Sequence, residues 1–289
     1  MGDAMERHDV MIIGTGPAGL SAAITAKIRN KKIMLLGSSN LSTKVEKAHA
    51  VQNYLGLPSV TGENMQKAFR EHIASMGIEI TEGRVSAVFP MGDYFGVQSS
   101  LGMLEASTVI LATGVVMGKP YPGEETFLGK GVSYCATCDA PLYKKKTVAV
   151  IAASVHEESE ANFLAEVAEK VYYVPLYKDE VHTSEKIEIV RETPKEIAGT
   201  SHVESFVTNA NTYSVDGVFI LRESIAPGQL VQGIEMDGAH VKVNRFMETS
   251  VHGCFACGDI VGRPYQYIKS AGEGNVAALS AVAYLDTHK

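Results

Sequence analysis

The sequence has few cysteines and no long apolar run. Four of its 289 residues are cysteine, which is too few for a disulfide scaffold of the kind found in small secreted domains. No segment approaches the roughly 18 continuous apolar residues of a membrane-spanning helix. Residues 1–8 carry charges but no apolar segment before a cleavage site. The sequence therefore predicts a cytoplasmic protein with no membrane contact, in a compartment that keeps thiols reduced.

Excess positive charge is also lacking. The formal net charge of −7 argues against a nucleic-acid-binding surface over the whole chain. Two local basic clusters remain, one at Lys144–Lys146 and one made of Lys27, Arg29, Lys31 and Lys32. Each is either a solvated surface or a dock for an acidic partner. The histidines are scattered without ligand spacing, so no metal site is predicted.

One glycine-rich turn stands near the start of the chain. The apolar run Val10–Ile13 leads into Gly14-Thr15-Gly16-Pro17-Ala18-Gly19, which matches G-x-G-x-x-G, and a helix-forming segment follows over 20–26. Such a unit predicts a dinucleotide site, because the glycines let the backbone approach a pyrophosphate at the positive end of the helix. The acidic residue that would bind a ribose is missing after the next predicted strand, residues 32–36. The sequence therefore supports binding of the pyrophosphate by backbone but identifies no carboxylate for the ribose at the adenosine end of the ligand.

A second strand-turn-helix unit lacks glycine in its turn. Residues 147–151 are predicted to form a buried strand and Glu157–Lys170 a helix, with the turn Ala152-Ala153-Ser154-Val155-His156 between them. Each alanine adds a Cβ where a pyrophosphate needs bare backbone, and the carboxylates of Glu157 and Glu158 occupy the positive potential that a phosphate would use. We expect this unit to have the shape of a dinucleotide-binding unit without its chemistry.

The four cysteines form two C-x-x-C pairs. Cys135-Ala136-Thr137-Cys138 is followed at once by Asp139, and in a chain without signs of export this spacing indicates a redox or metal-binding pair. Cys254 and Cys257 lie in an apolar strand that enters Gly-Asp, so they are interpreted as small buried residues. A Pro- and Gly-rich segment over 118–123 predicts a linker before the first pair.

Five motifs resemble the low-molecular-weight thioredoxin reductases. They are G-T-G-P-A-G, N-Y-L-G-L-P at Asn53–Pro58, L-A-T-G at Leu111–Gly114, G-V-S-Y-C-A-T-C-D at Gly131–Asp139, and F-A-C-G-D at Phe255–Asp259. The resemblance covers almost the whole chain, and C-A-T-C-D is highly specific. It implies an α/β protein with two Rossmann-like three-layer ββα domains. The redox-cysteine domain, with a degenerate pyridine-nucleotide fold, would occupy 118–245 and be inserted into a discontinuous FAD-binding domain made of 1–117 and 246–289.

The resemblance also implies roles for matching residues in a homodimer with one FAD per subunit. Cys138 would exchange electrons with the flavin, Cys135 would attack the disulfide of thioredoxin, and Asp139 would be the acid–base group for the thiols. Exchange through a thiolate and a mixed disulfide is consistent with these roles. A helix expected to begin near Gly272 would approach the pyrimidine edge of the flavin. The residues expected to bind FAD are Gly14, Gly16, Pro17, Ala18, Gly19, Asn53, Ala112, Thr113, Gly114, Gly258, Asp259, Gln266, Tyr267 and Ile268.

Both halves of the NADPH site of ordinary family members differ here. Those members have a glycine-rich second turn and a His-Arg-Arg string for the 2′-phosphate, where this chain has Ala152-Ala153-Ser154 and Pro175-Leu176-Tyr177. The departure resembles the ferredoxin-dependent flavin thioredoxin reductases, in which reduced ferredoxin takes the place of NADPH. A flavin can accept single electrons and pass on pairs, and a transient acidic donor suits a basic patch. We therefore expect electrons to pass from ferredoxin through FAD and Cys135–Cys138 to thioredoxin.

Two alternatives stay open. The first is a thioredoxin-type disulfide reductase with another donor, such as a second flavin or NAD(P)H bound in an unusual mode. The second is a flavin-containing binding or sensor protein that has lost catalysis. Retention of Cys135, Cys138 and Asp139 argues against the second, because a sensor has no need of an intact dithiol.

Overall fold

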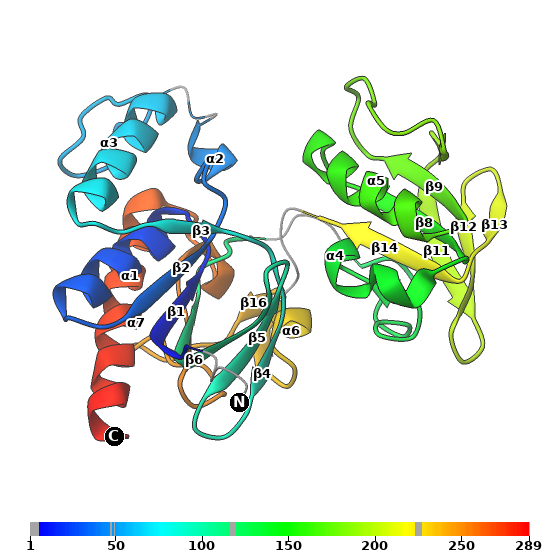
Figure 1. Ribbon diagram of the computed structural model, residues 1–289. Helices are drawn as coiled ribbons and strands as arrows, with labels where there is room; N and C mark the ends of the chain where they lie inside the picture. Colours follow the sequence, from blue (N-terminus) through cyan, green and yellow to red (C-terminus); the bar gives the residue numbers. More distant parts are fainter. Residues whose placement is uncertain (1–5, 47, 49, 116–119, 223–226, 289) are drawn as a thin grey trace. The chain divides into compact units, whose positions relative to one another are not determined.

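The computed structural model describes residues 6–46, 48, 50–115, 120–222 and 227–288; the side chains of Thr43, Lys44 and Cys138 lie outside this description. The chain divides into two compact units (Figure 1). Unit 1 contains Met1–Val116 and Ala226–Lys289, and unit 2 contains Met117–Ile225. Within the described ranges, no helix combines the length and the apolar character that crossing a bilayer requires.

Unit 1 is built on one mixed sheet. Its strands are β1 (His8–Ile13), β2 (Ile33–Gly37), β3 (Ile80–Glu82), β4 (Val85–Pro90), β5 (Phe95–Ser99), β6 (Gly102–Leu111) and β17 (Cys254–Ala256). The parallel part has the order β3-β2-β1-β6, and β17 also pairs with β6. Ile12 of β1 lies between Leu35 of β2 and Ile110 of β6. The strands β5 and β4 continue from β6 as an antiparallel meander.

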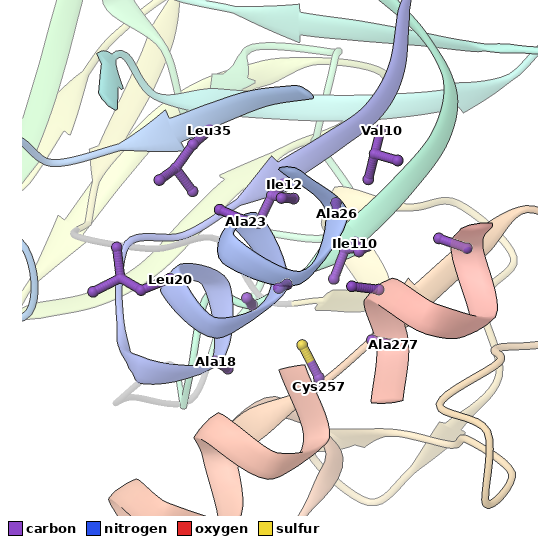
Figure 2. Packing of buried hydrophobic residues seen from close by; sticks show 14 of the residues in the cluster. Val10, Ile12, Ala18, Leu20, Ala23, Ala26, Leu35, Ile110, Cys257 and Ala277 are labelled. Atoms are coloured by element: carbon purple, nitrogen blue, oxygen red, sulfur yellow. The ribbon is translucent and has the colours of Figure 1, made fainter. Parts of the chain in front are cut away.

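Two long helices pack side by side in unit 1 and cover one face of the parallel strands (Figure 1). They are α1 (Pro17–Ile28) and α7 (Tyr267–Thr287), whose contact is the most extensive between any helices of the unit. Small residues allow the close approach. A Cβ on Gly274 would lie 2.0 Å from the carbonyl oxygen of Ala18. Figure 2 shows side chains of α1, of α7 and of the parallel strands meeting in one core, among them Val10, Ile12, Ala18, Ala23, Ala26, Ile110, Cys257 and Ala277.

Shorter elements complete unit 1. They are α2 (Thr43–Glu46), α3 (Gly62–Ser75), α6 (Pro227–Leu230), the hairpin of β15 (Met236–Asp237) and β16 (His240–Val241), and the 3₁₀ turn η3 (Gly258–Val261). The start of α3 is capped by the hydroxyl of Thr61, which accepts a hydrogen bond from the backbone N–H of Asn64.

Unit 2 is built on a five-stranded parallel sheet. Its strands are β7 (Val132–Ser133), β8 (Thr147–Ala152), β9 (Lys170–Pro175), β10 (Ile187–Ile189) and β14 (Gly217–Leu221), in the order β10-β9-β8-β14-β7. A separate antiparallel sheet contains β11 (Pro194–Gly199), β12 (Val203–Thr208) and β13 (Thr212–Ser214). The helical elements are α4 (Ala136–Asp139), η1 (Ala140–Tyr143), η2 (Val155–Glu157) and α5 (Glu158–Val167). Leu164 of α5, Val150 of β8 and Phe219 of β14 share the buried core.

The α/β fold class with Rossmann-like units is confirmed. Each unit has parallel strands joined through helices and an antiparallel meander, the three-layer arrangement expected from the motifs. The segment 227–241 lies in unit 1, whereas the sequence analysis placed 118–245 in the inserted domain. The reason is packing: α6 contacts β4, Val231 bridges to Val88, and β16 contacts η3.

Candidate functional site

The glycine-rich turn of unit 1 joins β1 to α1 and leaves the start of the helix uncapped. Gly16 is the N-cap residue, no side chain caps the helix, and its first turn contains no acidic residue. A Cβ on Gly14, whose φ is +119°, would lie 2.3 Å from the carbonyl oxygen of Ala112. A Cβ on Gly19 would lie 1.8 Å from the carbonyl oxygen of Gly14. Gly16 faces open space, with no heavy atom within 4 Å of an added Cβ. The turn therefore offers free N–H groups and room for a phosphate.

The segment after β6 lies beside this turn. Ala112 donates its backbone N–H to the carbonyl oxygen of Ile13 at 2.8 Å. The hydroxyl of Thr113 is buried and has no hydrogen-bond partner among the described residues. Gly114 has a φ of +73° and open space beside it. A buried hydroxyl without a partner is costly, so it indicates a polar ligand at this place.

The turn after β17 is held by charged and polar groups of α7. Gly258, with a φ of +87°, donates its N–H to Glu273 Oε2 at 3.0 Å. Lys269 Nζ donates to the carbonyl oxygen of Gly258 at 3.0 Å and pairs with Glu273 at 3.1 Å. The hydroxyl of Ser270 donates to Asp259 Oδ1 at 3.1 Å. These bonds fix the position of the Asp259 carboxylate.

Helix α7 begins earlier than the sequence indicated. Its first residue is Tyr267 and its N-cap is Gln266, so Gly272 lies inside the helix and the expectation of a start near Gly272 is wrong. Gln266 Oε1 accepts a hydrogen bond from Asn53 Nδ2 at 2.7 Å, which joins two predicted ligand residues that are far apart in the sequence. Burial, with a contribution from the charge of Asp259, raises the pKa of Tyr267. Ile268 in the first turn is exposed.

The pair of cysteines in unit 2 follows β7. Cys135 is buried and disulfide-bonded. Cys138 lies in α4, but its side chain is outside the described part of the structure. The hydroxyl of Ser133 donates to Asp139 Oδ2 at 2.7 Å and accepts the backbone N–H of Cys135 at 3.1 Å. Ser133 therefore links the backbone of Cys135 to the carboxylate of Asp139, and sequence reasoning had not singled it out.

The other cysteines are free thiols in unit 1. Cys254 and Cys257 are both buried, and Cys257 belongs to the core between α1 and α7 (Figure 2). Burial raises the pKa of Cys254 to about 12. Burial also raises the pKa of Cys257, and the nearby carboxylate of Glu273 adds to this effect. Both thiols are therefore protonated and unreactive at neutral pH, in line with their interpretation as small buried residues.

At the glycine-free turn of unit 2, side chains of the protein itself fill the start of α5 and form hydrogen bonds there. Glu157 and Glu158 are 2% and 9% exposed. Glu158 accepts hydrogen bonds from the hydroxyl of Tyr177 at 2.6 Å and from the backbone N–H of His182 at 3.1 Å. The hydroxyls of Tyr177 and Tyr173 are 2.9 Å apart. Burial raises the pKa of Tyr173 to about 12, and burial together with the hydrogen bond to Glu158 raises that of Tyr177. Both phenols are therefore neutral donors at physiological pH.

The comparison with known proteins agrees with the motifs. Residues 8–274 match the family model of pyridine nucleotide-disulphide oxidoreductases. The chain is 33% identical to the thioredoxin reductase of Aquifex aeolicus (strain VF5), over 98% of this chain and 94% of the relative. The chain belongs to the thioredoxin reductase family. This family member is therefore an oxidoreductase, as the motifs predicted.

Solved structures of thioredoxin reductases share this fold. A ferredoxin-flavin thioredoxin reductase from Clostridium acetobutylicum is 51% identical with a TM-score of 0.92, and the match covers 98% of this chain and 99% of the other. A thioredoxin reductase from Gloeobacter violaceus is 27% identical with a TM-score of 0.83, over 98% of this chain and 96% of the other. The resemblance to the thioredoxin reductase family is thereby confirmed.

A buried ion pair in unit 2 of this thioredoxin reductase homologue escaped the sequence analysis. The guanidinium of Arg222 donates to both carboxylate oxygens of Glu124, at 2.5 and 2.8 Å, and Glu124 is fully buried. Burial opposes the charge of Arg222, but the hydrogen bonds and charge of Glu124 outweigh it and raise the pKa of Arg222. Tyr134, next to Cys135, donates its hydroxyl to Glu124 at 3.1 Å. Glu124 and Arg222 are far apart in sequence, so no local pattern could have revealed the pair.

Proposed function

We propose that the protein is an FAD-dependent thioredoxin reductase that takes electrons from a reduced ferredoxin rather than from NADPH. Unit 1 would bind FAD and unit 2 would carry the redox pair Cys135–Cys138. Cys135 is disulfide-bonded and Cys254 and Cys257 are free, which supports Cys138 as its partner. The protein would act as a homodimer, as the resemblance implies.

The residues of unit 1 fit a dinucleotide such as FAD. The open, uncapped start of α1 suits a pyrophosphate, and the hydroxyl of Thr113 without a partner suits a polar ligand atom. Asp259, held by Ser270, is placed to accept hydrogen bonds from ligand hydroxyls. Gln266, held by Asn53, would meet the ring end together with Tyr267 and the exposed Ile268. When bound, a flavin supplies conversion between single electrons and electron pairs.

The start of α5 carries the proposal about the donor. A pyrophosphate needs free N–H groups and positive potential at a helix N-terminus. Here the buried carboxylates of Glu157 and Glu158 stand at this place, and Tyr177 and His182 bind Glu158. A nucleotide would have to displace these hydrogen bonds and approach the negative charges. The similarity to the ferredoxin-flavin thioredoxin reductase from Clostridium acetobutylicum, which is 51% identical to this chain, supports ferredoxin as the donor class.

Of the two basic clusters, Lys144–Lys146 is the stronger candidate for docking an acidic donor. Lys31 pairs with Asp286 at 2.7 Å and Lys32 pairs with Glu6 at 2.5 Å, so part of the charge of that cluster is neutralised. Lys144, Lys145 and Lys146 are exposed and follow the redox segment closely in sequence. Electron-transfer partners commonly meet over small, charge-steered interfaces.

The residues of unit 2 provide the thiol chemistry. In the proposed reaction the Cys135 thiolate attacks the thioredoxin disulfide, a bond between Cys135 Sγ and a thioredoxin sulfur forms, and the thioredoxin S–S bond breaks. Attack by Cys138 on this mixed disulfide then restores the internal disulfide and releases a thioredoxin with two reduced sulfurs. The Asp139 carboxylate, held by Ser133, would take and return the thiol proton.

An anaerobic titration of the purified holoprotein separates the alternatives. NADPH, NADH and chemically reduced ferredoxin are added in turn, and flavin bleaching and thiol release from thioredoxin are measured. We expect bleaching and thiol release with ferredoxin alone. Rapid bleaching by micromolar NADPH would overturn the proposal, and thiol release with neither donor class would favour a binding or sensor protein.

A further inference from the structure

A carboxylate from α5 binds the redox segment itself. Glu160 lies in the first turn of α5, and its Oε2 accepts the backbone N–H of Ala136 at 3.0 Å and that of Thr137 at 3.3 Å. Its Oε1 accepts the hydroxyl of Thr137 at 3.3 Å. Ala136 and Thr137 are the two residues between the cysteines of C-A-T-C. Three donors of the redox segment therefore converge on one carboxylate.

This arrangement changes the surroundings of Cys135. A cysteine directly before a helical turn is usually made more acidic, because free backbone N–H groups and the positive end of the turn stabilise its thiolate. Here Glu160 already accepts two of those N–H groups and adds a negative charge close to Cys135. Both effects disfavour the thiolate relative to the thiol.

Thiolate stability is linked to the reducing power of the pair. Reduction of a disulfide consumes two electrons, and two protons when both sulfurs end as thiols. A group that stabilises the thiolate stabilises the reduced form and makes the pair a weaker reductant. A group that destabilises the thiolate has the opposite effect, which suits a dithiol that must pass electrons on.

We propose that Glu160 is a positioning residue of the redox pair, which holds the backbone of the C-A-T-C segment and suppresses the ionisation of Cys135, so that the dithiol is strongly reducing. The inference deepens the proposed function, because it concerns the same dithiol. In this proposal the first turn of α5 binds the redox segment through Glu160 instead of binding a nucleotide.

The other titratable groups around the segment are engaged differently. Asp139, on α4, accepts the hydroxyl of Ser133. Tyr143, on η1, has a pKa raised by burial and by the charges of Asp139 and Asp216, so it is a neutral phenol. Glu158, on α5, binds Tyr177 and His182. Glu160 is thus the α5 carboxylate whose hydrogen bonds reach the residues between the cysteines.

The test compares Glu160→Gln with Glu166→Gln. The amide of Gln keeps the size of the side chain and one acceptor oxygen but removes the charge. Glu166 is exposed on the same helix, so its replacement makes the same change of net charge away from the redox segment. Each holoprotein is reduced with dithiothreitol, freed of it anaerobically, and pulsed with iodoacetamide from about pH 5 to about pH 9, a range that spans ordinary thiol ionisation. Peptide mass spectrometry then measures alkylation at Cys135.

We expect the pH of half-maximal alkylation of Cys135 to fall by about one unit in Glu160→Gln and to stay at the wild-type value in Glu166→Gln. Glu160→Ala, which also frees both N–H groups, should show at least the same shift. At a pH above the Cys135 pKa of both proteins, the equilibrium with dithiothreitol should move toward the reduced form by about tenfold in Glu160→Gln, because one unit of pKa corresponds to a factor of ten. At a pH below both pKa values it should not move, because both proteins then hold the neutral thiol. A merely structural cap would lower thermal stability without moving either quantity.

An unchanged alkylation profile in a folded Glu160→Gln would overturn the inference. The measurement needs neither thioredoxin nor an electron donor. A failure of the donor titration would therefore refute the proposed function and leave this result standing, and the reverse also holds.

Discussion

The starts of α1 and α5 occupy equivalent places in two units of the same kind, and their surroundings are opposite. At α1 the glycines bring backbone close to backbone, no acidic residue stands in the first turn, and space is open beside Gly16. At α5 the 3₁₀ turn η2 precedes the helix, and buried carboxylates and phenols fill the region. A helix dipole alone therefore does not make a phosphate site. The side chains of the first turn decide whether it serves a ligand or the protein itself.

The largest effect should come from Gly14→Ala at the start of α1. The new Cβ would lie 2.3 Å from the Ala112 carbonyl oxygen, on a residue with a φ of +119°. We expect a loss of at least about 3 kcal/mol in unfolding free energy, because backbone atoms cannot yield as a flexible side chain does. Urea unfolding and the FAD content after purification measure it. The matched exchange Ala152→Gly, at the last residue of β8 before the α5 turn, should cost only about 1 kcal/mol. Equal losses in the two variants would contradict the different backbone requirements of the α1 and α5 turns.

Gly16→Ala should separate ligand binding from folding at the same turn. The φ of Gly16 is −79°, which alanine adopts readily, and its Cβ would enter open space. The unfolding free energy of the FAD-free protein should stay within about 0.5 kcal/mol of wild type. The Kd for FAD should rise by about tenfold or more, since the methyl group stands where the phosphate needs bare backbone. Unchanged FAD affinity, measured by flavin fluorescence, would refute the assignment of the pyrophosphate to this turn.

At α5, Glu158→Gln should weaken the protein rather than a ligand site. The amide cannot accept from both Tyr177 and His182 as the carboxylate does. We expect a loss of about 1–2 kcal/mol in unfolding free energy, the usual cost of a buried hydrogen bond to a charged group. Glu166→Gln is the control. If Glu158→Gln gained bleaching by NADPH, the carboxylate would be the barrier to the nucleotide, and the roles of Glu157 and the alanine turn would need revision.

The smallest effect is the contribution of the phenols beside α5 to the pH dependence of stability. The pKa of Tyr173 is about 12 in the folded protein against an ordinary value of 10.0, and that of Tyr177 is also raised. The folded state thus holds these phenol protons more tightly than the unfolded chain. Stability from this source is complete below about pH 10 and is lost as the pH rises toward about 12. Tyr173→Phe should flatten this part of the curve of unfolding free energy against pH. A Phe variant with the wild-type slope would contradict the assignment.

Sequence reasoning worked best where the structure depends on local pattern. The strand Val10–Ile13, the glycine turn and the helix after it were predicted together and appear as β1 and α1. It failed at the start of α7. The helix begins at Tyr267 and continues through Gly272 and Gly274, although glycine is a poor helix former, and its packing against α1 leaves no room for a Cβ at Gly274. The boundary expected at residue 245 rested on position in the chain. The segment 227–241 packs in unit 1 through contacts with residues distant in sequence, such as that of Val231 with Val88, which no local pattern reveals.

The sequence alone determined the fold class, the family and the absence of a glycine turn before α5, because these are written in residue types at fixed spacings. Tertiary structure decided which partners the carboxylates of unit 2 have. Glu158 meets Tyr177 and His182, Glu160 meets the residues between the cysteines, and Glu124 meets Arg222 only when distant segments fold together. Each of these carboxylates is an ordinary charged residue in the sequence. Burial and hydrogen-bond geometry, which depend on the whole chain, give each one its role.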